Sequence, residues 1–492
     1  MRKQKFNRRQ FLKKSALTAA SLSVWSTLKA QPNAPANINA RVIGANDDIR
    51  VAVIGFNSRG QDHLKGMQEV KGVRIVALCD VDSNVLGREV KKFEDKKQPV
   101  TGYQDIRRLL ENKDIDAVTI ATPNHWHSLA AIWGIQAGKD VYVEKPVSHN
   151  VWEGRQLVTA ARKYERIVQT GTQCRSSPGL AEAVAWVQAG NLGKIKVARG
   201  LCYKRRASIG KTTGPQPVPE SVNYNLWTGP APMEPLRRAK LHYDWHWVWP
   251  TGNGDLGNQG IHQMDIARWF LGEAELSPRV LSVGGRVGYV DDGNTPNTLV
   301  VFHDYPTAPL IFEVRGLPQK SGAKAMDNYR GADVGVVVDC EHGYIVNPSY
   351  TRVNVFDKDG KQIKTFDGKA SHYENFIAAV RSRKSSDLHA DILQGHISSA
   401  LCHTGNISYR LGKVTSPDEL RSTMRANADL ADSLNRMQEH LGANAVNLTE
   451  TPLMLGTALT MNPPSERFTS NADANALLAA SYREPFVVPE KV

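Results

Sequence analysis

The chain of 492 residues contains two regions that differ in how apolar and polar positions follow one another. In the first region, short continuous apolar runs alternate with helical stretches. An apolar run of this kind, rich in β-branched residues, is typical of a strand that is covered on both faces. Strands that alternate with helices predict an α/β fold with a doubly wound parallel sheet over residues 48–170. The runs occupy residues 49–55, 73–80, 116–122 and 140–146.

After about residue 171, the pattern changes to alternating apolar and polar positions, which predicts an antiparallel meander with one packed face and one open face. Helical patterns near 180–190, 261–272, 372–384 and 391–411 are expected to cover it. We therefore expect a C-terminal α+β domain over 171–430 and an extension over 431–492 that wraps on the body. The alternating segments are 195–203, 280–290, 298–303, 310–314, 334–340 and 351–356.

The first thirty residues have the organisation of an export signal, with a cationic start, an apolar run over 16–28 and a small residue at Ala30. NRRQFLKK, at residues 7–14, resembles the twin-arginine signal, which predicts export of the folded protein to the periplasm. An ordinary secretory signal is the alternative. Residues 31–47 are predicted to be a polar linker. The apolar run is shorter than the roughly 20 residues of a spanning helix, so we expect no membrane span.

The net charge of +13 does not indicate a nucleic-acid partner, because residues 1–30 carry eight basic and no acidic side chains, which leaves +5 for the rest. The five cysteines are scattered and lack metal-like spacing, so a disulfide framework is not expected. His125 and His127 lack a third ligand at a suitable spacing, and no metal site is predicted.

A turn that could bind a dinucleotide follows the first predicted strand, in the sequence VAVIGFNSRG at residues 51–60. Gly55 would make the tight turn and Gly60 would let the helix approach the strand. Asn57 stands where the fingerprint G-x-G-x-x-G has its middle glycine, so the motif is incomplete. Ser58 and Arg59 complete the predicted contacts of this turn.

The residue that ends the next strand, Asp80, lies 25 positions after Gly55, close to where an acid binds the adenosine ribose hydroxyls. A carboxylate there repels the extra phosphate of NADP, which favours NAD. Arg59 indicates the opposite preference, since a guanidinium beside the turn could hold that phosphate. The sequence therefore predicts NAD, with NADP as an alternative.

Several segments together resemble the Gfo/Idh/MocA family, the relatives of glucose-fructose oxidoreductase and inositol dehydrogenase. The resemblance spans about residues 48–412. It implies an N-terminal Rossmann domain, a C-terminal domain whose sheet often forms an oligomer interface, and a nicotinamide cofactor between the two. It thus also implies a homo-oligomer. The matching segments are 55–60, Thr122-Pro123-Asn124 followed by His127, Glu144-Lys145-Pro146, 226–232, 260–265 and 372–384.

The resemblance also implies roles for single residues. Lys145 matches the lysine that hydrogen-bonds the reacting hydroxyl, His262 the histidine that shuttles its proton, and Asp265 the acid one helical turn later. Many dehydrogenases of the family have Asp where this chain has Asn258, and Asp255 is the candidate to replace that acid. The implied cofactor contacts further along the chain are Thr122, Pro123, Asn124, His127, Glu144 and Lys145.

Candidate substrate contacts are aromatic and polar. Trp245, Trp247 and Trp249 would lie on one side of an extended segment, where indoles could stack on sugar rings, although tryptophans at this spacing are more often structural. Arg175 could reach a substrate or form a salt bridge. Trp247, Arg175, Asn258 and Tyr203, at the end of the strand predicted over 195–203, are the predicted substrate residues.

These features predict an exported NAD(P)-dependent oxidoreductase that transfers hydride between a tightly bound nicotinamide and a secondary hydroxyl of a sugar or glycoside. The first alternative resembles family 109 glycoside hydrolases, in which transient oxidation, elimination and return of hydride leave no net redox change. The second alternative is a non-catalytic sugar-binding protein, which Asn258 would permit.

Overall fold

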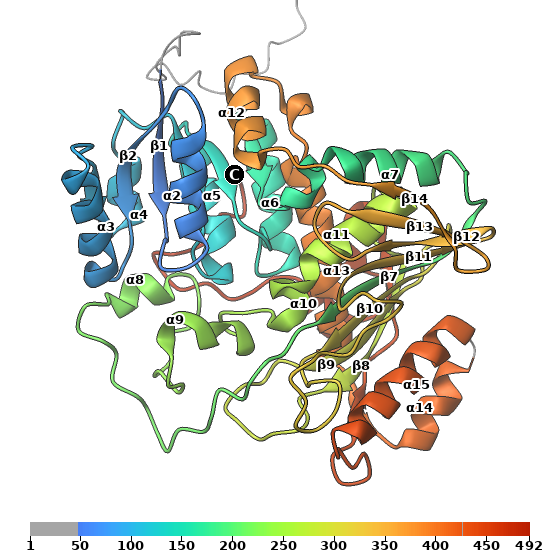
Figure 1. The fold of residues 1–492 in the computed structure, drawn as a ribbon. Coiled ribbons are helices and arrows are strands. Elements are labelled where there is room, and N and C mark those ends of the chain that lie inside the picture. Colours follow the sequence, from blue (N-terminus) through green and yellow to red (C-terminus); the bar gives the residue numbers. More distant parts are fainter. Residues whose placement is uncertain (1–47, 426) are drawn as a thin grey trace, which may run out of the picture. The chain divides into compact units, whose positions relative to one another are not determined.

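The structure is a computed structural model that describes residues 48–425 and 427–492 (Figure 1). The predicted signal over 1–30 and the predicted linker over 31–47 lie outside the described residues. Among the described residues, no helix has both the length and the apolar character needed to cross a membrane. All five cysteines are buried and carry free thiols, as expected from their spacing.

The first sheet has six parallel strands in the order β3-β2-β1-β4-β5-β6. This order confirms the doubly wound Rossmann fold, including the four strands expected from the apolar runs. The order reverses between β1 and β4, so the carboxyl ends of these two strands face a crevice. The strands are β1 (Ile49–Ile54), β2 (Val73–Cys79), β3 (Thr101–Tyr103), β4 (Ala117–Ile120), β5 (Asp140–Val143) and β6 (Val168–Thr170).

Both faces of this sheet are buried, which explains the continuous apolar runs. Ala52 and Ile54 of β1 pack with α5 and α6 on one face. Val51 and Val53 point to the other face, where they pack with α2 and also with α12 (Figure 1). The helices are α2 (Gly60–Glu69), α3 (Ser83–Asp95), α4 (Ile106–Leu110), α5 (His127–Gln136), α6 (Val151–Lys163) and α12 (His372–Ser382).

The second sheet is mixed and mostly antiparallel, with the main order β14-β13-β12-β11-β7-β10-β9-β8-β16-β15. It is not the expected simple meander, because β7 lies between β10 and β11 and runs parallel to β10. Strands β17 and β18 extend it beside β8. The strands are β7 (Ile195–Tyr203), β8 (Arg279–Gly285), β9 (Thr298–His303), β10 (Leu310–Arg315), β11 (Val334–Cys340), β12 (Gly343–Asn347), β13 (Val353–Asp357), β14 (Gln362–Phe366), β15 (Lys413–Thr415), β16 (Leu453–Leu455), β17 (Leu459–Asn462) and β18 (Arg467–Phe468).

Helices cover both faces of this sheet unequally. α7 (Pro178–Gln188), α11 (Gly260–Leu271) and α13 (Ile392–Arg410) pack on one face. On the other face, Leu434 and Met437 of α15 (Ala428–Ala443) pack against Val300 and Ile311, and α14 (Pro417–Met424) lies beside α15 (Figure 1). The face expected to be open is therefore partly covered, over β8 to β10.

The end of the chain crosses back to the Rossmann sheet. After α16 (Ala472–Ala476), Tyr482 packs on Trp152 of α6. Phe486, Val488 and Val492 belong to the same apolar cluster as Ala52 and Ile54. The last ten residues therefore complete the core of the N-terminal sheet.

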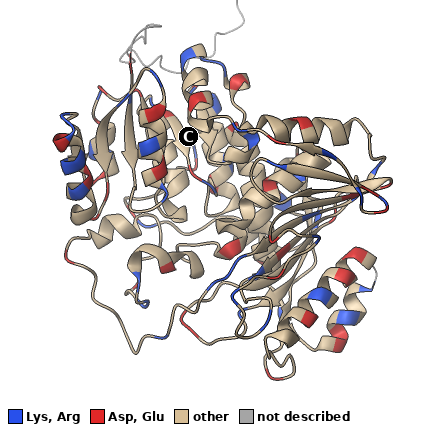
Figure 2. Ribbon diagram, in the orientation of Figure 1, with Lys and Arg blue, Asp and Glu red and all other residues tan. Residues whose placement is uncertain are grey.

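Basic and acidic residues alternate along α3, α14 and α15, where Figure 2 shows blue and red side by side. Lys91 pairs with Asp95 on α3, and Arg421 pairs with Asp418 on α14. This mixture agrees with the modest charge that remains beyond residue 30.

Candidate functional site

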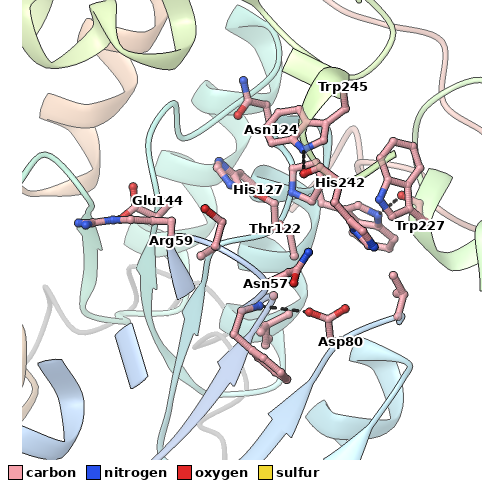
Figure 3. A pocket seen from close by; sticks show the side chains of 18 of the residues that line it. Asn57, Arg59, Asp80, Thr122, Asn124, His127, Glu144, Trp227, His242 and Trp245 are labelled. Carbon is pink, nitrogen blue, oxygen red and sulfur yellow. Dashed lines mark hydrogen bonds and ion pairs between the residues drawn. The ribbon is translucent and has the colours of Figure 1, made fainter. Parts of the chain in front are cut away.

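A cavity of about 260 Å³ lies at the carboxyl ends of β1 and β4 (Figure 3). It occupies the crevice that a doubly wound sheet uses to bind dinucleotides. Asn258, from the C-terminal half, lines it as well. Gly60 is the one predicted cofactor residue outside the lining. The predicted residues that line the cavity are Gly55, Asn57, Ser58, Arg59, Asp80, Thr122, Pro123, Asn124, His127, Glu144 and Lys145.

The turn after β1 depends on both of its glycines. Gly55 has φ +76°, and a Cβ added there would lie 2.9 Å from the backbone nitrogen of Thr122. A Cβ on Gly60 would lie 2.0 Å from the carbonyl oxygen of Gly55. Only glycine lets the turn approach β4 and lets α2 begin this close to the strand. The missing middle glycine, at Asn57, therefore does not prevent the fingerprint geometry.

Asp80 lies beside this turn. Its Oδ2 accepts a hydrogen bond from the backbone N–H of Phe56 at 3.2 Å, and its Oδ1 accepts one from Asp82 at 3.0 Å. Burial raises the pKa of Asp80, and these two N–H groups oppose the rise. Among the described residues, only backbone N–H groups hydrogen-bond this carboxylate.

These residues fit a dinucleotide. Gly55 and Ser58 of the turn line the cavity, and Thr122 Oγ1, from the loop after β4, is buried without a hydrogen-bond partner among the described residues. Asp80 supplies an acceptor of the kind that binds ribose hydroxyls. The site thus has an acid for a ribose, a glycine turn for a pyrophosphate and a free hydroxyl further along the cavity.

Arg59 is occupied by carboxylates. Its Nε donates to Glu144 Oε1 at 2.9 Å, and its Nη1 donates to Asp62 Oδ2 at 2.9 Å. Glu144 also contacts His63 Nε2 at 3.1 Å. Burial alone would raise the pKa of Glu144, but Arg59 and His63 hold it well below its usual range. Since the Arg59 guanidinium already has two anionic partners, the structure does not favour it as the holder of an extra phosphate.

Lys145 follows β5 and precedes a cis peptide bond to Pro146. Its Nζ donates to the backbone oxygen of Asn258 at 3.0 Å. Burial lowers the pKa of Lys145, and Glu144 opposes this. The His127 ring lies between the carbonyl oxygens of Pro146 and Thr122, at 2.6 and 2.7 Å, and so connects the loops after β4 and β5.

His262 lies in the first turn of α11 and is 4% exposed. Its Nδ1 has no hydrogen-bond partner among the described residues. Burial, together with the nearby Lys145 ammonium, lowers the pKa of His262 to about 3, so the imidazole is neutral. Its ring centroid lies 5.2 Å from that of Tyr350. Lys145 is thus close enough to His262 to affect its pKa, but Lys145 lines the cavity and His262 does not.

Two predicted site residues instead pair with each other. Arg175 makes a bidentate ion pair with Asp265, with Nε to Oδ2 at 2.8 Å and Nη2 to Oδ1 at 2.9 Å. Ser398 also donates to Asp265 Oδ1 at 2.7 Å. Neither partner lines the cavity. Asp255 is likewise bound by Arg206, at 2.7 and 2.8 Å.

The tryptophan segment is helical rather than extended, as α9 (Leu241–Asp244) and the 3-10 turn Trp245–Trp247. The three indoles therefore do not share one side. Trp245 lines the cavity, whereas Trp247 is buried beneath the guanidinium of Arg206, 5.0 Å from its ring centroid. Tyr203 lies away from the cavity, where its hydroxyl donates to Glu313 Oε2 at 2.6 Å.

Sequence reasoning missed most of the residues on the far side of the cavity. The segment 226–232 is part of the family resemblance, but no motif marked its side chains or His242 as cavity residues. The residues missed include Phe56, Gln104, Trp126, Leu226, Trp227, His242, Tyr243 and His246.

Comparisons with known proteins agree with the fold and with a nicotinamide cofactor. Residues 49–172 match the family model described as "Oxidoreductase family, NAD-binding Rossmann fold", and residues 185–298 match "Oxidoreductase family, C-terminal alpha/beta domain". The chain belongs to the Gfo/Idh/MocA oxidoreductase family, and its Rossmann part is of the NAD-binding kind.

Curated relatives include a "Glycosyl hydrolase family 109 protein" of Shewanella pealeana, 35% identical over 33% of this chain and 38% of that protein. One of the same name from Saccharopolyspora erythraea is 30% identical over 40% of this chain and 46% of that protein. The chain thus spans less than half the length of these relatives.

Among solved structures, the chain is similar to the WlbA dehydrogenase of Bordetella pertussis in complex with NADH and UDP-GlcNAcA. The TM-score is 0.53 and the sequence identity is 17%, and the match covers 72% of this chain and 94% of the WlbA chain. The WlbA enzyme of Chromobacterium violaceum has a TM-score of 0.56 and 16% identity, with coverage of 75% and 96%. At this identity, the likeness shows the fold.

Proposed function

We propose that this protein is a nicotinamide-dependent enzyme that removes hydride from a secondary hydroxyl of a sugar or glycoside, with NAD held tightly and preferred over NADP. The observation that carries the proposal is that Lys145 lines the cofactor cavity and lies close enough to His262 to lower its pKa. Lys145 comes from the Rossmann half and bonds Asn258, four residues before His262.

A bound nicotinamide supplies a hydride acceptor. Lys145 Nζ is placed to donate a hydrogen bond to the reacting oxygen, in exchange for its bond to Asn258. The neutral imidazole of His262 can then take the hydroxyl proton. Burial of both groups excludes water from this transfer. The chain's contribution is thus orientation by Lys145 and proton transfer by His262.

A second candidate is a redox-neutral glycosidase, which the names of the curated relatives favour. Oxidation of a ring hydroxyl acidifies the neighbouring C–H, the aglycone leaves by elimination, water adds and hydride returns. This reaction uses the same Lys145 and His262. A non-catalytic sugar-binding protein would need neither residue for its ligand to bind.

Assays of aryl glycosides without added cofactor separate the three functions. Steady release of the aglycone supports the glycosidase. Reduction of the bound nicotinamide that stops after one equivalent, without aglycone release, supports the dehydrogenase. Sugar binding without aglycone release and without nicotinamide reduction supports the non-catalytic sugar-binding protein and would contradict our proposal.

Export and assembly are part of the proposal. NRRQFLKK at residues 7–14 supports twin-arginine export to the periplasm. Cell fractionation of a variant in which Arg8 and Arg9 are both lysine should find the protein retained in the cytoplasm. The second sheet presents β14, where Ile363 is 51% exposed, which supports a homo-oligomer to be checked by light scattering.

A further inference from the structure

Residues 221–246, here named the cover segment, pass over the cofactor cavity and are bonded to the Rossmann half at two places. The first place follows β2. Ser83 donates its backbone N–H to the carbonyl of Ser221 at 2.8 Å, and Asn223 donates to Val81 at 3.1 Å. Asp82 and Val222 form a β-bridge. In Figure 1 the two short helices of the segment, α8 (Tyr224–Thr228) and α9, lie beyond the carboxyl ends of β1 and β2.

The second place follows β4. The indole Nε1 of Trp126 donates to the carbonyls of Leu226 and Trp227, both at 3.0 Å. The ring of His125 also bonds the Trp227 carbonyl, at 3.1 Å. A Cβ on Gly229 would lie 2.2 Å from the Trp126 ring, so the backbone rests directly on the indole. The cover segment thus packs directly on the Rossmann half and is hydrogen-bonded to it.

Between these places, the cover segment forms one wall of the cavity. Trp227, His242 and Trp245 line it, and Figure 3 shows them across from Asn57 and Asp80. His242 Nε2 contacts Asp82 Oδ2 at 2.9 Å, two residues after the acid expected at the ribose. Because this wall stands beside Asp80, it encloses the adenosine half of the site.

The end of the chain holds the cover segment in place. Arg483 donates to the side-chain oxygen of Asn225 at 2.7 Å and to its carbonyl at 2.9 Å. Phe486 is 1% exposed and packs edge-on against Trp126, with ring centroids 5.5 Å apart. The Arg483 guanidinium lies 4.8 Å from the Phe486 ring centroid. Residues 483–486 therefore contact both the cover segment and the Trp126 indole on which the cover segment rests.

We propose that residues 483–486 lock the cover segment over the adenosine side of the cavity, so that a bound dinucleotide exchanges only when this lock opens. This inference rests on the proposed function for the identity of the ligand. Opening the adenosine side would require breaking contacts at β2, at β4 and at the tail together.

The test measures exchange of bound NAD⁺ for isotope-labelled NAD⁺ in the full chain. We expect Arg483→Ala and Phe486→Ala to raise the exchange rate at least about tenfold, because affinity losses appear mainly as faster dissociation. Lys491→Ala is the matched control, since Lys491 is exposed in the same tail, and it should exchange like the unaltered protein.

Rapid exchange in the unaltered protein, or equal rates in all variants, would overturn the inference. Should Phe486→Ala unfold, His242→Leu breaks the contact with Asp82 at the other end and should show the same acceleration. The measurement needs no sugar. Slow exchange of NAD⁺ without turnover of any glycoside would contradict the proposed reaction, but it would still support the role of the cover segment in holding the dinucleotide.

Discussion

Lys145 Nζ donates a hydrogen bond to the backbone oxygen of Asn258 at 3.0 Å, and this bond joins the loop after β5 to the segment that leads into α11. A backbone oxygen accepts this bond with no formal charge. Burial lowers the pKa of Lys145, and the charges of Glu144, its chain neighbour, and, more weakly, Asp255 oppose this.

Replacement of Lys145 by methionine should lower kcat by roughly 10²- to 10⁴-fold, the usual contribution of a positioned acid–base group. NAD binding should persist, because the glycine turn and Asp80 do not depend on Lys145. Steady-state kinetics and NAD titration measure the two effects. Lys71→Met is the control, since Lys71 is an exposed lysine of the same half. Full activity in Lys145→Met would contradict the assigned role.

Asn258→Asp should restore a carboxylate beside Lys145 and His262. A negative charge favours the imidazolium, so the pKa of His262 should rise from about 3. The neutral imidazole is lost below that pKa, and the acid limb of the kcat/KM profile should therefore move to higher pH, by about 1 to 3 units. Asn258→Ser, which adds no charge, should leave the limb in place. An unshifted limb in Asn258→Asp would show that His262 does not control the rate.

Asp80→Ser should weaken the preference for NAD over NADP. The carboxylate is fixed by the N–H groups of Phe56 and Asp82. A carboxylate at this strand end is expected to repel the extra phosphate of NADP. Removal of the carboxylate should lower the ratio of the NADP Kd to the NAD Kd by about tenfold or more, roughly 1.4 kcal/mol. Calorimetric titration with both nucleotides gives the ratio. Asp95→Ser, an exposed acid on α3, should not change it.

The parts of the fold that depend on local sequence could be predicted. The apolar run before Gly55 and the glycines at 55 and 60 gave β1 and its turn, because strand burial and a tight turn each require particular residues nearby. α11 was expected over 261–272 and spans Gly260–Leu271. Its apolar periodicity and the left-handed Gly272 after it mark both ends.

Contacts between distant residues could not be predicted in this way. Arg175 and Asp265 are 90 positions apart, and nothing in either segment indicates that one neutralises the other. The tail packs Phe486 onto Trp126 through apolar side chains that carry no periodic signal. The tryptophan segment alternates in sequence like a strand, yet α9 and the turn after it are helical.

The ion pair of Arg175 with Asp265 should matter for stability. Burial alone would raise the pKa of Asp265, but Arg175 holds it below its usual value. Arg175→Met leaves a buried carboxylate without its main partner and should lower the free energy of unfolding by about 3 to 5 kcal/mol. Urea unfolding measures this. Arg421→Met, which breaks the exposed pair with Asp418, should cost less than about 1 kcal/mol. Equal effects in the two variants would contradict this assignment.

His303 of β9 should make the protein less stable in acid. The residue is fully buried, and burial lowers its pKa from the ordinary 6.5 to about 3. Between these values the unfolded chain binds a proton that the folded chain does not, so stability falls as pH falls. Above pH 6.5 His303 is neutral in both the folded and the unfolded chain, so it causes no loss of stability. Each such histidine adds about 1.4 kcal/mol of lost stability per pH unit.

His303→Leu should therefore reduce the slope of unfolding free energy against pH by about one proton, between roughly pH 6 and pH 4. His125, His262, His372 and His403 are also buried with lowered pKa values and should contribute to the slope. Urea unfolding at several pH values measures it. His342→Leu removes an exposed histidine and serves as the control. If both variants keep the original slope, His303 is protonated in the folded protein, and the strand must move to let water reach it.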